Sequence, residues 1–599
     1  MNRRDLFKIA AAAGMAGAGI AYPGRRGFAA ASRTFDLNVE AARITVDGTT
    51  SAALAIGGSV PGPVMRWREG EEVVIRVTNR LREPTSIHWH GLLLAGVMDG
   101  APGFNGFVAI GPGDTYTYRF VLRQAGTYWY HSHSGGQEQA GMYGAIVIEP
   151  AMGEKIATPR DYVVLLSDHT TEHPDTILRR LKANNDIYVK APRTILDFFR
   201  DSARDGLAPT IEDRKMWGNM RMSPTDLSDV TGYQFLMNGK GAGDNWTGLF
   251  KPGERMRLRF INGSAMTFFD VRIPDLKMTV IAADGQDVVP VPVDEFRIGI
   301  GETYDVLVVP GADRAYTVMA EPIDRSGYVR GTLAPREGMQ AEVPKLRPRA
   351  LLTMSDMGSM GNMDPGSMTG KDHSGMPGMT QGSMPPDNSN MATMDHSKMP
   401  GMDHSTMPGM KQGSMPDRDP SKARGMGPSM DQRTVTADGA PLRGWDSAGT
   451  LPGQKALRYE DLKSLAANKD ARPPTQELMI ELDGQMTRYN WTLNGMRFDQ
   501  AAPIRVKYGE RVRIRYMNAT MMAHPMHLHG MFVELENGQT NRMPRKHVVV
   551  VRPGSAASVI LTANEPGDWP FHCHLLFHMN AGMMTRFVVE PPRRMALAR

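Results

Sequence analysis

Polar and apolar residues alternate over three short stretches of the chain that are alike. Each stretch begins with Gly-Glu and ends with Asn, at residues 70–79, 253–262 and 509–518. A period of two places one apolar face of a β-strand against a core. A turn signal, Pro-Gly-Pro or Asn-Gly, precedes each stretch, at 61–63, 238–239 and 494–495. The pattern predicts three related β-rich domains with sandwich or barrel architecture.

The region at about 175–230 has a different texture. Apolar residues there are grouped as in helices, and short helical pieces are expected at Ile177–Leu181 and Ile195–Arg200. No metal-ligand spacing stands out in this insertion. The middle domain is therefore interpreted as a spacer that holds the outer domains in place.

Composition fits a large globular protein. The 599 residues correspond to about four units of ordinary domain size, or three larger ones. The formal charge is 69 − 64 = +5, but residues 1–31 alone carry a net +4, so the remainder is near +1. This charge does not suit a polyphosphate-binding surface, and nucleic acid is not an expected partner.

Residues 1–31 have the order of an export signal. The charged start Asn2-Arg3-Arg4-Asp5-Leu6-Phe7-Lys8 is followed by a mild apolar run at 9–21 and by Ala29-Ala30-Ala31. The arginine pair resembles a twin-arginine leader. No later stretch approaches 18 uninterrupted apolar residues, so a soluble periplasmic protein rather than an integral membrane protein is expected.

A methionine-rich segment interrupts the chain before the third repeat. Residues 354–430 contain 17 Met but no Leu, Ile, Val, Phe, Trp or Tyr, so they cannot build a core. One octapeptide recurs there, at 372–379, 395–402 and 403–410. Because soft thioethers favour Cu(I), the segment is predicted to recruit copper ions; a plain flexible linker is the alternative.

Histidines are concentrated in the two outer repeats. Four His-x-His pairs occur, at His88 and His90, His131 and His133, His527 and His529, and His572 and His574. In a strand, the two imidazoles of each pair project to one face. The position of His88 and His527 in the repeat is taken by Val271 in the middle copy. The outer domains are thus predicted to carry metal ligands at their mutual interface, and the middle domain none.

The single cysteine narrows the choice of metal. Cys573 lies between His572 and His574, with His524 upstream and with His578 and Met583 downstream. Two imidazoles, a thiolate and a thioether form the ligand set of a blue-copper centre. In an extended segment Cys573 points away from its two neighbours, which gives an electron a covalent route to a second site. Chance core or surface histidines are the competing interpretation, but 10 of the 16 histidines fall in these motifs.

With these motifs the chain resembles a three-domain multicopper oxidase, most similar to the copper-resistance protein A (CopA-like) branch. That branch is indicated by the run 131–139, by Asp213-Arg214-Lys215-Met216-Trp217-Gly218 and by the Met-rich segment. The resemblance implies an all-β fold of three cupredoxin-like Greek-key β-sandwich or barrel domains, with a disordered Met-rich insertion before the third. The expected parts are a leader at 1–31, domains at 32–150, 151–350 and 436–599, and a flexible copper-binding segment at 351–435.

The resemblance also implies the ligands of four copper ions. Type 1 copper would take His524, Cys573, His578 and axial Met583. Type 2 copper would take His88 and His527. The type 3 pair would take the six remaining histidines, His90, His131, His133, His529, His572 and His574. Additional Cu(I) is expected in the Met-rich segment.

Reduction of dioxygen consumes protons, so a general acid is needed near the cluster. Asp99 is the first candidate because relatives keep an acid at this place, and Glu138 is the second. Many bacterial members have Glu directly after the type 1 histidine that follows Cys, but this chain has Met579 there. Proton delivery is therefore expected to use another route.

Two functions stay open at this point. The first is an oxidase that takes electrons from Cu(I), passes them on through Cys573 and reduces O₂ to water, with phenols as a weaker choice of donor. The second is a copper-sequestering protein whose Met-rich segment protects the cell. A two-domain copper nitrite reductase is disfavoured because it needs fewer histidines. Cu(I), O₂ and other periplasmic copper-resistance proteins are the expected partners.

Overall fold

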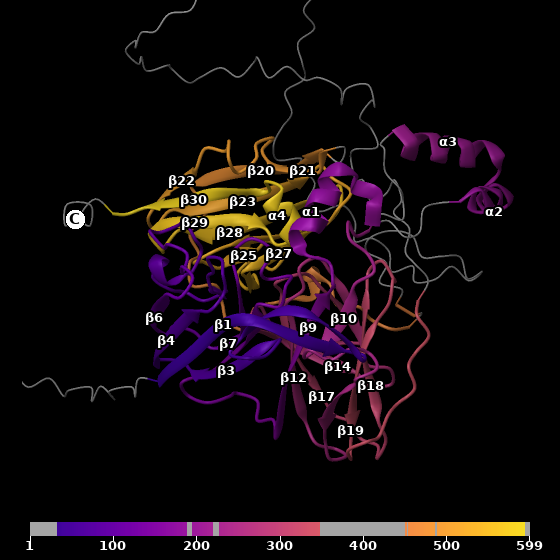
Figure 1. The fold of residues 1–599 in the computed structure, drawn as a ribbon, viewed down its shortest axis with the longest axis horizontal. Helices are drawn as coiled ribbons and strands as arrows, with labels where there is room; N and C mark the ends of the chain where they lie inside the picture. The colour runs from indigo at the N-terminus through magenta and orange to yellow at the C-terminus, as the bar shows by residue number, and fades with distance from the viewer. Residues whose placement is uncertain are drawn as a thin grey trace, which may run out of the picture.

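The computed structural model describes residues 33–188, 194–219, 227–347 and 450–592, apart from 452, 486 and 487. The predicted leader and the predicted Met-rich segment lie outside the described residues. Strands dominate the described chain and form three bodies (Figure 1). We call β1–β8 domain 1, β9–β19 domain 2 and β20–β30 domain 3.

Domain 1 consists of two four-stranded sheets. The first has the order β2 (Thr49–Ile56), β1 (Arg33–Val46), β4 (Glu72–Asn79), β6 (Thr115–Val121). The second has the order β3 (Gly62–Arg68), β8 (Tyr143–Glu149), β7 (Gly126–His131), β5 (His88–His90). Trp67, Trp89 and Tyr118 are among the buried side chains that fill this domain.

Domain 2 repeats this plan with a six-stranded and a five-stranded sheet. The first has the order β10 (Gln234–Met237), β9 (Arg160–His169), β12 (Met256–Asn262), β17 (Thr303–Val308), β14 (Met278–Ala283), β15 (Gln286–Val293). The second has the order β11 (Trp246–Leu249), β19 (Val329–Ala334), β18 (Tyr316–Pro322), β13 (Phe269–Arg272), β16 (Glu295–Ile298).

Domain 3 has the same two sheet sizes as domain 2. The first has the order β21 (Asn490–Leu493), β20 (Gln476–Gln485), β23 (Arg511–Asn518), β28 (Ala556–Thr562), β25 (Val533–Leu535), β26 (Arg545–Lys546). The second has the order β22 (Ile504–Lys507), β30 (Met584–Glu590), β29 (Gly567–Cys573), β24 (His524–Leu528), β27 (Val548–Val551).

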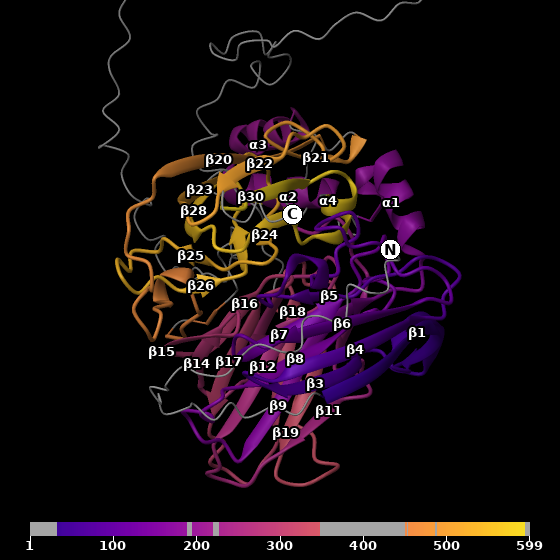
Figure 2. The same ribbon diagram turned by 90° about the vertical axis from the view of Figure 1, so that its left-hand side faces the viewer.

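The three Gly-Glu repeats occupy equivalent places. They form β4, β12 and β23, and each pairs in parallel with the first strand of its domain and antiparallel with a later one. The prediction of three related β domains is confirmed. In both views domain 3 covers one end of domains 1 and 2 (Figures 1 and 2).

Helices are few and short in the described residues. They are α1 (Pro174–Ala183), α2 (Ile195–Asp205), α3 (Leu207–Asn219), α4 (Leu576–Asn580) and the 3-10 turns η1 (Gly96–Met98), η2 (Asn185–Tyr188) and η6 (Tyr459–Asp461). The two helical pieces expected in the insertion are confirmed as α1 and α2, while α3 was not predicted. Thr194 and Asp197 form a capping box that starts α2. Among the described residues, no helix combines the length and apolarity needed to cross a membrane.

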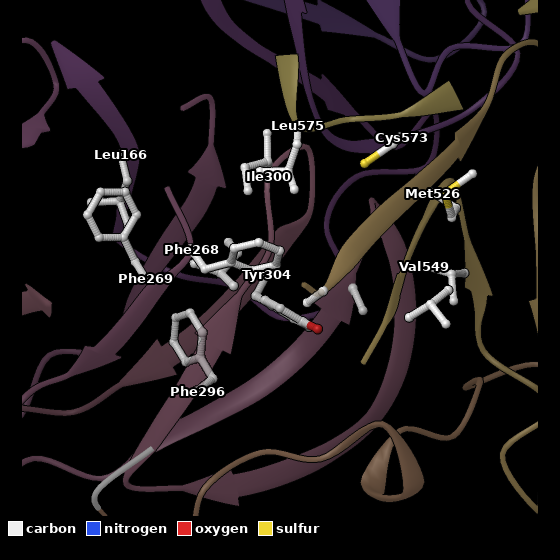
Figure 3. Packing of buried hydrophobic residues seen from close by; sticks show 14 of the residues in the cluster. Leu166, Phe268, Phe269, Phe296, Ile300, Tyr304, Met526, Val549, Cys573 and Leu575 are labelled. Atoms are coloured by element: carbon white, nitrogen blue, oxygen red, sulfur yellow. The ribbon is translucent and has the colours of Figure 1, made fainter. Parts of the chain in front are cut away.

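The hydrophobic core is continuous between domains 2 and 3. One buried cluster contains Phe296 and Tyr304 of domain 2 together with Met526 and Cys573 of domain 3 (Figure 3). A continuous core fixes the relative position of two domains, because separating them would expose the shared apolar surface. Domain 3 is thereby held against domain 2, and it also contacts domain 1.

Candidate metal centre

Strand pairing places histidines opposite one another in both outer domains. In domain 1, His88 of β5 is the direct partner of His131 of β7. In domain 3, His527 of β24 is the direct partner of His572 of β29. The histidine-bearing ends of these two strand pairs meet between the domains, where the rings of His88 and His529 stack at 3.9 Å. These two strand pairs carry five of the eight histidines of the His-x-His pairs, and the other three, His133, His529 and His574, follow within two residues of the strand ends.

The eight histidines form three groups that each draw on both outer domains. In each group the candidate ligand atoms lie within 4.8 Å of one another. The groups are His88, His90 and His527; His90, His131 and His574; and His133, His529 and His572. The structure thus brings together every histidine that the sequence assigned to type 2 and type 3 copper.

In His88, His131 and His527 the Nδ1 atom is already engaged, and this fixes the direction of the other nitrogen. His88 Nδ1 lies 2.8 Å from the Asp99 carbonyl oxygen, and His527 Nδ1 lies 2.7 Å from the His547 carbonyl oxygen. The Nε2 atoms of His88, His131 and His527 are buried and have no hydrogen-bond partner among the described residues. Leaving such atoms unsatisfied costs about 1–3 kcal/mol each, so this arrangement fits a bound metal ion.

The two predicted acids contact ligand histidines directly. The Asp99 carboxylate lies 2.8 Å from His529 Nδ1, and its backbone carbonyl holds His88. Glu138 Oε2 lies 2.7 Å from His131 Nδ1. Burial, aided by the charge of Asp168, raises the pKa of Glu138 well above its ordinary value. Both acids therefore orient ligands, and their predicted role as proton donors stays a prediction.

The histidines are held in the form that binds metals. Burial first, and then neighbouring histidines, lowers the pKa well below its ordinary value for His90, His131, His133, His524, His527, His529 and His574. Burial lowers the pKa of His572 to about 4. Neutral imidazole is the form of histidine that donates to a metal.

A second site lies on the other face of the same tripeptide. Cys573 Sγ lies 3.6 Å from His524 Nδ1 and 3.8 Å from His578 Nδ1, and these two nitrogens are 3.2 Å apart. Burial raises the pKa of the Cys573 thiol. A thiolate in such a place requires a cation beside it. Met583 is fully buried, and its backbone carbonyl accepts a hydrogen bond from the Cys573 amide.

An acid that the sequence did not reveal completes this second site. Asp229 Oδ2 lies 2.6 Å from His578 Nε2, and Tyr489 donates a hydrogen bond of 2.6 Å to the same oxygen. On its other side the His578 ring stacks on Trp491 at 3.8 Å. Asp229 follows the helical insertion of domain 2, so this domain is more than a spacer.

The donor set therefore fits copper at both places. Neutral imidazoles suit copper, and a site of two imidazoles and one thiolate with a thioether nearby in sequence is the blue-copper pattern. His524 Nε2 lies 2.7 Å from Thr520 Oγ1, so both imidazoles of this site present Nδ1 to the sulfur. Outer partners of this kind are a regular part of metal sites.

Comparison with known proteins agrees with this geometry. Three models described as multicopper oxidase match residues 38–153, 160–337 and 471–593. The chain belongs to the multicopper oxidase family. The resemblance seen in the sequence is thereby confirmed, and this multicopper oxidase is a copper-dependent oxidoreductase.

Curated relatives match almost the whole length of this multicopper oxidase. Copper resistance protein A of Pseudomonas syringae pv. tomato is 50% identical over 607 residues, covering 98% of this chain and 99% of the relative. Copper resistance protein A of Escherichia coli is 48% identical and covers 93% and 92%. The laccase from Botrytis aclada shares the fold, with a TM-score of 0.62 at 21% identity, covering 93% of this chain and 88% of that one.

Proposed function

We propose that this multicopper oxidase protects the periplasm against copper by oxidising Cu(I) to Cu(II) and reducing O₂ to water. One observation carries the proposal: the His572-Cys573-His574 tripeptide serves a Cys-His site on one face and the histidine groups on the other. The names of its relatives support the link to copper resistance. The leader predicted at 1–31 supports the location.

Four copper ions would complete the two sites. His524, Cys573, His578 and Met583 would hold one, and the eight histidines of the His-x-His pairs would hold three. Copper so held takes up and gives out single electrons, which reduction of O₂ requires four times. The chain itself joins the sites, because Cys573 is bonded through the backbone to a histidine of each type 3 ligand group.

The surroundings of His578 favour a small reductant over a phenol. Its ring is completely buried, and its outer nitrogen is occupied by the Asp229 carboxylate. A phenol therefore cannot stack on or hydrogen-bond to this imidazole. A metal ion needs no such ring contact, and the link of the relatives to copper resistance favours Cu(I) as the donor. Cu(I) is the donor that this arrangement supports best.

Protons for the reaction would come from the carboxyl groups nearest to the histidines. Asp99 and Glu138 are assigned this role because each lies within hydrogen-bond distance of a ligand ring. Burial raises the pKa of Glu138, which favours its protonated form and so suits a proton donor. Met579 carries no proton, so it cannot serve.

Copper sequestration is the second candidate, favoured by the 17 Met of residues 354–430. Two variants separate the candidates in cells that depend on this protein for copper tolerance. Cys573→Ser should abolish oxygen uptake and leave Cu(I) binding by the Met-rich segment intact, and deletion of 354–430 should weaken Cu(I) collection only. Tolerance lost with Cys573→Ser supports the oxidase. Tolerance that survives Cys573→Ser but not the deletion would overturn it in favour of sequestration.

A further inference from the structure

One buried histidine next to the cluster belongs to none of the His-x-His motifs. His547 lies between β26 and β27 of domain 3 and is 2% exposed. Its ring is 4.8 Å from the ring of His90, nearly perpendicular to it. A polar side chain buried at the junction of three domains needs a reason to be there.

His547 contacts two ligand histidines with two different groups. Its ring Nδ1 lies 3.2 Å from His90 Nε2, and its backbone carbonyl accepts a hydrogen bond of 2.7 Å from His527 Nδ1. His90 comes from domain 1 and His527 from domain 3. His547 thus bridges the two halves of the cluster.

Domain 2 fixes the position of His547. Asp284 Oδ2 accepts hydrogen bonds from the backbone amides of His547 at 3.0 Å and Val548 at 3.1 Å. Lys546 Nζ lies 3.1 Å from the same carboxylate oxygen and 2.9 Å from Glu302. With the backbone clamped on both sides of its Cα, the His547 ring has little freedom to move.

Gly91 makes room for this ring. A Cβ atom at position 91 would lie 2.5 Å from His547 Cδ2 and 2.8 Å from its Nε2, closer than real Cβ contacts. The glycine directly after His90 is therefore required for His547 to reach His90. The presence of glycine at position 91, directly after His88-Trp89-His90, thus has a steric explanation.

The contact gives His90 an orientation opposite to that of its neighbour. His131 is bound through Nδ1 by Glu138, which leaves its Nε2 directed at the group. In His90 it is Nε2 that is engaged, and Nδ1 lies 3.3 Å from His574 Nε2, among the other ligand atoms. His90 therefore has only Nδ1 to offer to a metal.

We propose that His547 is a positioning residue that holds His90 with Nδ1 toward the type 3 copper by accepting a hydrogen bond from its Nε2. The proposal rests on the proposed function, because it takes His90 as a copper ligand. His547 does not touch the reacting atoms. Its effect is to select one ring orientation of His90, which otherwise could turn and offer Nε2.

A matched pair of variants tests the hydrogen bond. His547→Asn keeps an acceptor oxygen near the place of Nδ1, whereas His547→Leu has nearly the same shape as Asn and no acceptor. Both keep the backbone carbonyl that binds His527. Copper per chain, the type 1 absorption and the type 3 absorption are measured on the purified full chain titrated with copper. Circular dichroism reports folding, and His547→Met replaces the Leu variant if that variant does not fold.

The Leu variant should bind copper at the type 3 site about 10–100-fold more weakly than wild type, with the type 1 absorption unchanged. The Asn variant should recover most of this loss. Equal copper affinity in Leu and wild type would overturn the proposal, and so would equal losses in Leu and Asn. A wild-type chain that itself binds no type 3 copper would instead refute the proposed function.

Discussion

The outer domains and the middle domain share a fold and differ in what they bury at equivalent strands. In the outer domains the paired strands β5·β7 and β24·β29 place histidine opposite histidine. In domain 2 the equivalent pair β13·β18 places Val271, at the position of His88 and His527, opposite Ala320; one residue earlier, Asp270 lies opposite Glu321, and both carboxylates are fully buried. The same two strands therefore carry imidazoles in two copies of the repeat and carboxylates in the third.

The carboxylates of domain 2 have their counter-charges within the protein. Arg297 and Arg325 contact Asp270 at 2.7 and 2.6 Å, and Arg347 contacts Glu321 at 3.0 Å. Burial alone would raise the pKa of Asp270, but the two arginines outweigh burial and lower it. This architecture therefore accepts buried polar groups if each has a partner. In domain 2 the partners of the buried carboxylates are guanidinium groups. In the outer domains we propose that copper ions are the partners of the buried imidazoles.

Cys573→Ser should have the largest effect of the variants considered, and it acts on the metal sites of the outer domains. The hydroxyl is a poor copper ligand, so the type 1 absorption should vanish and oxygen uptake should fall to the uncatalysed rate. Copper bound by the histidine groups should remain. Elemental analysis and oxygen-electrode recordings check this, and continued uptake by the Ser variant would contradict the role of Cys573.

Arg325→Met removes one of the buried arginine partners in domain 2. This change leaves the buried Asp270 with Arg297 alone, so the cost should stay below the roughly 3–5 kcal/mol expected when a buried charge loses its only partner. Copper content should not change, because the site is not in the outer domains. Chemical denaturation measures the free energy of unfolding. Arg336→Met is the control, since Arg336 pairs with Asp313 on the surface and should contribute less than about 1 kcal/mol.

Asp229→Asn tests how far domain 2 takes part in the type 1 site. The amide keeps the shape but removes the charge beside His578, so type 1 copper affinity should fall about 10–100-fold. Competition with a copper chelator measures this affinity. Asp275→Asn, at an exposed pair with Arg314, is the control and should have no effect. An unaltered copper affinity in the Asp229 variant would show that domain 2 does not support the type 1 site and acts only as a spacer.

The smallest expected effect concerns the reduction potential of the type 1 site. Met583→Leu replaces a thioether by a hydrocarbon of similar size, and loss of a weak axial ligand should raise the reduction potential. A rise of roughly 60 mV corresponds to tenfold in a one-electron equilibrium. Redox titration of the type 1 absorption gives the value, and an unchanged or lower potential would contradict the axial assignment.

The sequence predicted the parts of this protein that recur locally. Alternating strands revealed the three domains, and i, i+2 spacing in strands revealed the paired histidines, because both signals lie within a few residues. The position of Cys573 between two histidines predicted that this tripeptide serves a separate metal site on each face of its strand. The helix α3 was missed, since it contains Pro209 near its start and Gly218 near its end, and both residues disfavour helix interiors.

Three residues that act across domain boundaries could not be predicted. Asp229 lies more than three hundred residues before His578, and nothing in its local sequence indicates a contact with that ring. His547 lies beside a run of valines that looks like an ordinary strand, and only the fold brings it to His90. Asp284 is one of many turn aspartates until it is seen to clamp His547. Single residues without a repeating partner leave no periodic signal.

Oxygen uptake by the copper-loaded protein, measured with Cu(I) and separately with a phenolic donor, shows whether this protein is a Cu(I) oxidase. We expect rapid uptake with Cu(I), at about one O₂ for each four Cu(I), and much slower uptake with the phenol, because the His578 ring is buried. Uptake no faster than the uncatalysed oxidation of Cu(I), in a protein that shows the type 1 absorption, would contradict this expectation.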